Sequence, residues 1–142
     1  MTNTTTIKFR FKIGLYLNTS MGLKVRVNNK TILDVDQFLQ DWHELEFSAM
    51  LPLIVEFETI GKMLSDTLID SNGDILEDKF ISIEQMSVDG IWIKQWILES
   101  RLFENATSNI KTNYFGQNGI ARFQIPYSDI MQFWLDTVTV DD

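Results

Sequence analysis

Apolar and polar residues alternate along most of this chain, a pattern typical of strands with one buried and one solvated face. The longest alternating run covers Ile7–Leu17, and its polar positions are mainly basic. Shorter runs with the same period cover Leu23–Val27, Leu45–Ala49 and Leu53–Thr59. Because Pro52 separates the last two runs, they form either two strands or one strand bent at a sheet edge.

Short turns rich in glycine and asparagine join several of these runs. Asp89-Gly90 lies between the apolar runs Phe80–Val88 and Ile91–Leu98, which is a strong signal for a two-residue hairpin. Asn28-Asn29 and Asn72-Gly73 are turn signals of the same kind. The chain is therefore expected to fold as a series of antiparallel hairpins.

The hydrophobic period changes from two to about 3.6 near the end of the chain, which predicts a short helix over Tyr127–Asp136. A single helical turn is also expected at Asp36–Gln40. Further short strands are predicted at Arg101–Phe103 and Ile120–Ile125. Many short strands at a spacing of about 8–12 residues predict an all-β fold, a single-domain antiparallel β-sandwich of jelly-roll type with a short C-terminal helix. A β-barrel is the alternative architecture.

The length of the chain is that of a single domain. A chain of 142 residues buries roughly 68–70% of its unfolded surface, which is enough for one core. No repeat or low-complexity linker interrupts it. We expect a polar N-terminal tail at residues 1–6, a sandwich domain at residues 7–137 and an acidic tail at residues 138–142.

Composition and charge exclude several functional classes. The net charge of -8 disfavours a nucleic-acid partner, because binding phosphates requires clustered cations. The absence of cysteine removes disulfides, thiolate nucleophiles and sulfur-ligated zinc. The polar N-terminus and the lack of a long apolar run predict neither an export signal nor a membrane span.

The sequence offers no recognisable catalytic centre. His43 is the only histidine, and no nucleophile motif accompanies it, so we interpret it as a structural or surface residue. Carboxylate pairs could in principle support glycoside hydrolysis, but alternation assigns them to solvated sheet faces, at Glu44, Glu46, Glu56 and Glu58. The protein is therefore not expected to be an enzyme.

Oxygen-bearing side chains are concentrated in one short segment, at Asp66, Asp70, Asn72, Asp74 and Asp78. Calcium prefers such ligands. An EF-hand that begins at Asp70 is rejected, because Ile75 stands where that loop requires glycine and Ile81 stands where it requires a bidentate glutamate.

Two interpretations of this segment remain open. In a hairpin that turns at Asn72-Gly73, Asp66 faces Lys79, whereas Asp70 and Asp78 lie on opposite faces and cannot share an ion. In an irregular loop, the aspartates could instead converge on calcium. We favour the plain hairpin and keep a possible calcium site, with the ligands Asp66, Asp70, Asp74 and Asp78, as the alternative.

Aromatic residues supply the candidate binding surface, because flat rings stack on sugars and also anchor protein interfaces. Tyr114 and Phe115 lie in the glycine-rich segment Asn113–Gly119 and are expected to be exposed. Asn118 in the same segment and Trp42 complete the candidate ligand- or partner-binding residues. The remaining tryptophans are expected in the core, at Trp92, Trp96 and Trp134.

The acidic segment Asp66–Asp78, followed by a strand that ends in Val88-Asp89-Gly90, resembles the C-terminal half of calcium-dependent xylan-binding-like carbohydrate-binding modules. Together with Val25-x-Val27-Asn28-Asn29-Lys30 and Leu45-x-Phe47, it also resembles small β-sandwich proteins of marine tailed phages that infect cyanobacteria. The resemblance covers about residues 22–98. It implies a small β-sandwich, in which aspartates of the acidic segment would hold calcium that contacts a sugar.

Two functions are consistent with these features. The first is a non-enzymatic structural or interaction protein of a phage virion, such as a capsid decoration or fibre-associated subunit, which binds other virion proteins or itself. Such a protein would be made in the host cytoplasm and reside in the virion. The alternative is a calcium-assisted carbohydrate-binding module with a glycan partner. The oligomeric state distinguishes the two, because a decoration protein needs a large apolar interface.

Overall fold

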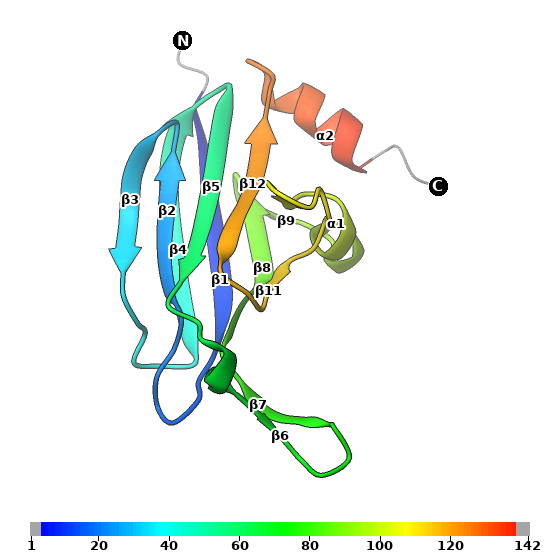
Figure 1. Cartoon of the computed structure of the whole chain (residues 1–142). Coiled ribbons are helices and arrows are strands. Elements are labelled where there is room, and N and C mark those ends of the chain that lie inside the picture. The colour runs from blue at the N-terminus through cyan, green and yellow to red at the C-terminus, as the bar shows by residue number, and fades with distance from the viewer. Residues whose placement is uncertain (1–3, 139–142) are drawn as a thin grey trace.

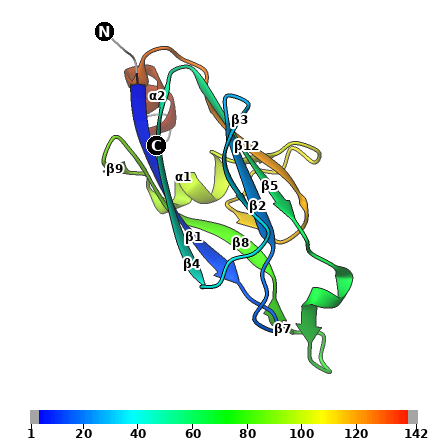
Figure 2. The ribbon, with the colours of Figure 1, turned by 90° about the vertical axis from the view of Figure 1, so that its left-hand side faces the viewer.

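The computed structural model describes residues 4–138 and consists of two antiparallel sheets packed face to face (Figures 1 and 2). The first sheet contains β1 (Thr4–Gly14), β4 (Trp42–Met50), β8 (Phe80–Val88), β9 (Ile91–Trp92) and β11 (Tyr114–Phe115). The second sheet contains β2 (Gly22–Val27), β3 (Lys30–Val35), β5 (Leu53–Ile60), β10 (Glu104–Asn105) and β12 (Gly119–Ile125). The predicted sandwich is confirmed, and the barrel alternative is wrong.

A separate two-stranded hairpin projects from one end of the sandwich (Figure 1). It is formed by β6 (Thr67–Ile69) and β7 (Ile75–Asp78), and the short 3-10 helix η1 (Leu64–Asp66) precedes it. We call residues Thr67–Asp78 the arm. The preferred hairpin interpretation of the acidic segment is therefore confirmed.

Local sequence signals explain most of the strand boundaries. Asn28 and Asn29 both have positive φ angles, 50° and 67°, and close the hairpin of β2 and β3. Asp89 and Gly90 do the same for β8 and β9, with φ angles of 51° and 82°. Such left-handed conformations fit the tight two-residue turns that match strand twist, and asparagine, aspartate and glycine tolerate them best. β1 starts at Thr4, earlier than the predicted start at Ile7.

Pro52 marks a transfer of the chain from one sheet to the other. The strand before it, β4, pairs with β1 in the first sheet, whereas the strand after it, β5, pairs with β2 and β12 in the second. The two alternating runs on either side of Pro52 are thus two strands rather than one bent strand.

The core lies between the sheets and is rich in phenylalanine. The alternating residues of β1 point inward and are fully buried, as at Phe9 and Phe11. Phe9 meets Phe57 of the opposite sheet edge to face, with ring centroids 5.2 Å apart. Phe103 and Phe123 extend this cluster. Aromatic pairs of this geometry add about 0.5–1.5 kcal/mol beyond the burial of their area.

The run Ile91–Leu98 is not the strand that the sequence predicts. Only Ile91–Trp92 pairs with β8, and the helix α1 (Gln95–Ser100) follows. This helix buries Ile97 and Leu98 and leaves Trp92 and Trp96 exposed, at 55% and 40%, so the predicted burial of these two tryptophans is wrong. A short apolar run does not reveal by periodicity alone whether it forms strand or helix.

Two smaller predictions also differ from the structure. Residues 36–40 form an irregular segment with bends instead of a helical turn, because Phe38 is buried and its backbone N–H donates to the Ser20 hydroxyl at 2.7 Å. Strand pairing after α1 begins at Glu104 and not within Arg101–Phe103.

The C-terminal helix α2 covers Ile130–Val138, so it starts later than the predicted Tyr127. Asp129 accepts a hydrogen bond from the Met131 N–H at 2.9 Å at the start of this helix. Phe133 is buried against Phe123, and Trp134 packs partly buried on the core. Between residues 4 and 138, no helix is long and apolar enough to cross a membrane. Most of the predicted acidic tail, residues 139–142, lies outside the described residues.

Candidate ligand-binding groove

An open cavity of about 460 Å³ lies beside β11, between the root of the arm and the loop that leads into β12. We call it the groove. Lys62 and Asp78 line it at the root of the arm, and Ile75 lines it from the arm itself. Tyr114 and Gln117 contribute the side of β11 and its following loop. The groove therefore brings apolar surface together with a few polar groups, as ligand sites commonly do.

Tyr114 supplies the aromatic wall of the groove. Its side chain is 46% exposed, as the sequence predicts. The ring stacks on Phe80 with centroids 5.1 Å apart and planes inclined by 23°. Partial burial, together with the nearby Asp78 carboxylate, raises the pKa of Tyr114. The hydroxyl is therefore protonated at neutral pH and is available as a hydrogen-bond donor.

Phe115 is buried, so its predicted exposure is wrong. Only 9% of it is exposed, and its ring packs against Phe57 and Phe103 with centroids 6.3 and 6.4 Å away. Because successive side chains of a strand point to opposite faces, Tyr114 points outward when Phe115 points into the core. Phe115 forms part of the groove floor and is not a free contact residue.

Asn118 positions the loop that follows the groove wall. Its side-chain oxygen accepts a hydrogen bond from the Lys62 N–H at 2.9 Å, and its amide nitrogen donates to the Lys62 carbonyl at 3.0 Å. Both ends of the amide are thus used within the protein. Asn118 therefore holds the loop beside the segment that follows β5.

Lys62 links the arm to this same loop. Its ammonium lies 2.6 Å from Oδ1 of Asp78, and each side chain is only 14% exposed. The ammonium also donates to the carbonyl of Gly116. Thr67 donates its hydroxyl to the same Asp78 oxygen at 2.7 Å. The sequence pattern did not indicate Lys62, because its partners lie far along the chain and no periodic motif contains it.

A second lysine–aspartate pair lies at the root of the arm. The Lys79 ammonium is 3.2 Å from Asp66, and both side chains are largely buried. The Met63 N–H donates to Asp66 at 2.8 Å and, together with Lys79, lowers the pKa of this carboxyl. The predicted opposition of Asp66 and Lys79 is confirmed, although a bulge between Leu68 and Ile69 shifts the register nearer the tip.

The remaining two aspartates of the acidic segment lie at the tip of the arm. The Asp70 carboxylate accepts backbone hydrogen bonds from Asn72 and Asp74, at 2.8 and 2.9 Å, and so stabilises the turn. Asp66 and Asp78 lie instead at the root, each beside its own lysine. Among residues 4–138, no group of three or more histidine, aspartate or glutamate side chains could hold a metal ion. The four aspartates proposed as calcium ligands do not converge.

Trp42 is separated from the groove by the width of the first sheet. The strand order β11-β8-β1-β4 places Tyr114 and Trp42 on opposite edge strands. Trp42 is partly exposed, and the guanidinium of Arg10 lies 4.4 Å from its ring centroid. The structure therefore does not bring these two candidate residues into one site.

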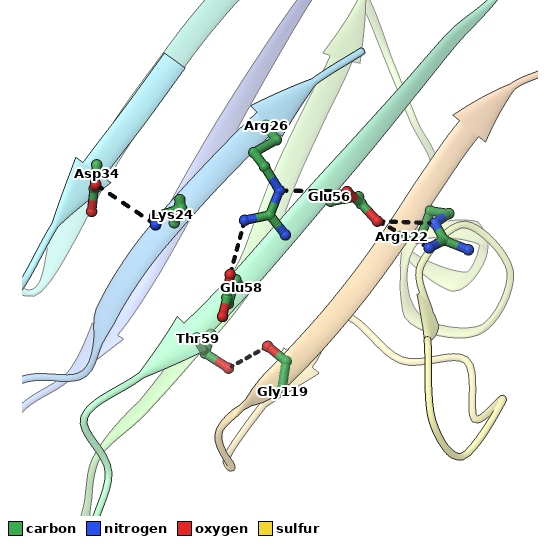
Figure 3. Close-up of polar contacts among 8 residues, drawn as sticks. All are labelled: Lys24, Arg26, Asp34, Glu56, Glu58, Thr59, Gly119 and Arg122. Atoms are coloured by element: carbon green, nitrogen blue, oxygen red, sulfur yellow. Dashed lines mark hydrogen bonds and ion pairs between the residues drawn. The ribbon is translucent and has the colours of Figure 1, made fainter. Parts of the chain in front are cut away.

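The glutamates of β5 form ion pairs on the outer face of the second sheet (Figure 3). Arg26 contacts Glu58 at 2.8 Å, and Glu56 lies between Arg26 and Arg122, at 3.5 and 2.9 Å. Hydrogen bonds from Arg122 and then Arg26 lower the pKa of Glu56. Glu56 is thus an ionised structural partner, not the protonated acid that glycoside hydrolysis requires.

His43 packs against an aromatic neighbour. Its ring lies 4.9 Å from the ring of Phe38, and burial lowers its pKa. It is therefore a neutral, half-buried packing residue at neutral pH.

No protein-family model matches the sequence, and no curated protein is significantly similar to it. Two solved structures share its fold. One is a selenomethionine form of vCBM60, described with two families of calcium-dependent carbohydrate-binding modules; it has a TM-score of 0.52 and 11% identity over 84% of this chain and 90% of that chain. The other, vCBM60 in complex with galactobiose, has a TM-score of 0.50 and 14% identity over 84% of this chain and 97% of that chain. The small β-sandwich that the sequence resemblance implies is confirmed, and its structural neighbours are carbohydrate-binding modules.

Proposed function

We propose that this protein is a non-catalytic carbohydrate-binding domain and that the groove beside Tyr114 holds its glycan. The observation that carries this proposal is the half-exposed ring of Tyr114, which is fixed by its stack on Phe80 at the edge of a groove of about 460 Å³. A flat aromatic face suits the apolar face of a sugar ring. Gln117, Asn105 and Ser108 also line the groove and carry groups that can hydrogen-bond to hydroxyls.

The fold supports this proposal independently of the groove. One similar structure is described with carbohydrate-binding modules, and the other is a complex with a disaccharide, galactobiose. Binding without hydrolysis is consistent with the commitment of Glu56 and Glu58 to arginine partners. We therefore expect no turnover of the glycans that bind.

The test is a binding screen against galactobiose and xylo-oligosaccharides, followed by titration calorimetry with wild-type protein and two alanine variants. Tyr114→Ala should abolish binding while the protein stays folded. Trp42→Ala is the matched control, because this partly exposed aromatic residue lies on the opposite edge of the same sheet. A blank screen, or equal loss in both variants, would exclude the groove as a glycan site.

A second function is favoured by the arm. The arm projects from the body (Figure 1), and its aliphatic side chains are exposed, at Leu68, Ile69, Ile75 and Leu76. Exposed apolar side chains that cluster commonly mark a protein interface. With the sequence resemblance to phage proteins, this supports a role as a virion-associated subunit, a capsid decoration or fibre-associated protein, that assembles with further copies of itself.

Sedimentation analysis tests the assembly proposal. Ile69 and Ile75 pair across the arm, and the double variant Ile69→Lys/Ile75→Lys should sediment as a monomer if the arm joins copies of this chain. The wild-type protein should form a larger species at the same concentration. A wild-type monomer at high concentration would contradict self-assembly through the arm.

A further inference from the structure

Two largely buried lysine side chains neutralise the carboxylates at the root of the arm. Lys62 lies 2.6 Å from Asp78, and Lys79 lies 3.2 Å from Asp66. All four side chains are between 10% and 14% exposed. By contrast, the surface pair of Lys24 and Asp34 has side chains that are 36% and 55% exposed. The root pairs therefore sit in an environment where an unpaired charge is costly.

These pairs do not fit a calcium site. Calcium requires six to eight oxygen ligands at about 2.3–2.6 Å. An ammonium in contact with Asp78 repels a second cation from the same carboxylate. To admit calcium, the Lys62 ammonium would have to give up its contacts with both Asp78 and the Gly116 carbonyl.

Lys62 also joins two sides of the groove, the arm and the loop after β11. Its ammonium joins the arm, through Asp78, to the loop after β11, through Gly116. Its backbone holds the same loop through both ends of the Asn118 amide. Lys62, Asp78 and Gly116 all line the groove. A single residue thus connects the arm, the loop and the strand that precedes η1.

We propose that Lys62 and Lys79 act as internal cations at the root of the arm, so that the arm and the groove are held in place without calcium. One of the similar structures is described with calcium-dependent modules, and this chain departs from it in that respect. The ion pairs alone hold the arm in place without calcium. Calcium-independent binding of a glycan rests in addition on the proposed function.

The first experiment compares the wild-type protein in excess EGTA with the same protein in added calcium chloride. The melting temperature should be equal in the two buffers, and calorimetric titration with calcium should show no saturable binding. If the protein binds a glycan, its Kd should also be unchanged. A higher melting temperature in calcium, stoichiometric calcium binding, or glycan binding that EGTA abolishes would overturn the proposal.

The second experiment removes the internal cation. Lys62→Met should lower the melting temperature by about 5 °C or more, because it leaves the Asp78 carboxylate largely buried and unpaired. The double variant Lys62→Met/Asp78→Leu should recover part of this loss, since it removes both charges. Lys24→Met is the control and should shift the melting temperature by less than about 2 °C, because its ion pair is exposed.

The outcomes separate the two proposals. Equal losses in Lys62→Met and Lys24→Met would contradict the role of Lys62. If Lys62→Met does not fold, the EGTA and calcium comparison of the wild-type protein still decides the question of calcium. If the wild-type protein binds no glycan in either buffer, the proposed function fails, whereas the melting temperatures and the calcium titration still test the internal cations.

Discussion

The ring of Tyr114 lies over the ring of Phe80, with centroids 5.1 Å apart and an angle of 23° between the planes. The two residues begin neighbouring strands, β11 and β8, which pair in the first sheet. The stack restricts the rotation of Tyr114 before any ligand arrives. Binding of a ligand to the exposed face of Tyr114 therefore costs less side-chain entropy than binding to a ring that rotates freely.

Tyr114 and Phe115 are expected to respond oppositely to truncation. Phe115→Ala should lower the free energy of unfolding by about 3–5 kcal/mol, because it empties a site between Phe57 and Phe103. Tyr114→Ala should cost only about 0.5–1.5 kcal/mol, the value of one aromatic pair, and should remove glycan binding. Urea denaturation and calorimetry measure both effects. Equal destabilisation by the two variants would show that Tyr114 is a core residue.

Gly14 is expected to control the position of Phe80. It faces Phe80 across β1 and β8, and a Cβ at this position would clash with the Phe80 ring and lie 2.7 Å from the Asp78 carbonyl oxygen. Gly14→Ala should therefore destabilise the protein by about 1–3 kcal/mol and weaken glycan binding by displacing the Tyr114 stack. Chemical denaturation should show partial recovery in Gly14→Ala/Phe80→Leu. Wild-type stability in Gly14→Ala would be inconsistent with this packing.

Glu56 should make stability depend on acidic pH. The pKa of Glu56 in the folded protein lies below the usual 4.5. The stability that Glu56 contributes is therefore complete above pH 4.5 and is lost as the pH falls through its folded-state pKa. Glu56→Gln should cost about 0.5–1 kcal/mol at neutral pH, as expected for a partly exposed ion pair. Thermal melts over a pH series should show the two proteins converging in acid. A difference that persists at the lowest pH would show that charge is not the cause.

His43 should contribute a second pH dependence in a higher range. Burial lowers its folded pKa below the usual 6.5. The unfolded chain then binds a proton more readily, so stability falls as pH drops from 6.5 toward the folded value. His43→Gln should lack this component, and melts between neutral pH and about pH 5 measure it. If the melting temperatures of variant and wild type depended on pH in the same way, the His43 ring would be exposed to solvent.

The features that could be predicted from sequence are those that depend on neighbouring residues. The alternation of β1 and the turns at Asn28 and Asp89 need only neighbouring residues, and the structure confirms them. The β8 boundaries, Phe80–Val88, also follow from the run that ends at Asp89. The sandwich could be inferred because such local signals recur along the whole chain.

The features that could not be predicted depend on contacts between distant segments. Phe115 lies in a glycine-rich loop sequence, yet Phe57 and Phe103 bury it. The pairing of Lys62 with Asp78 depends on where the arm leaves the body, which no periodic pattern records. The apolar run after Trp92 forms a helix for the same kind of reason, because tertiary packing buries Ile97 and Leu98 on one face of α1. Phe57, Phe115, Lys62 and Asp78 all line the groove, so its shape depends on such long-range contacts.

The position of β1 in the middle of the first sheet has a consequence for how the chain acquires its structure. Lys8 pairs with Glu46 on one side and with Ser87 on the other, so β1 cannot complete its hydrogen bonding until β8 has been synthesised. The Asp89 carboxylate then accepts hydrogen bonds from Thr5 and Thr6 and closes the assembly at the far end. Closing such long loops costs entropy before the contacts repay it, so refolding should proceed on the millisecond-to-second timescale of all-β sandwiches. During translation, β1 must therefore wait for β8, a partner that lies far downstream in the sequence.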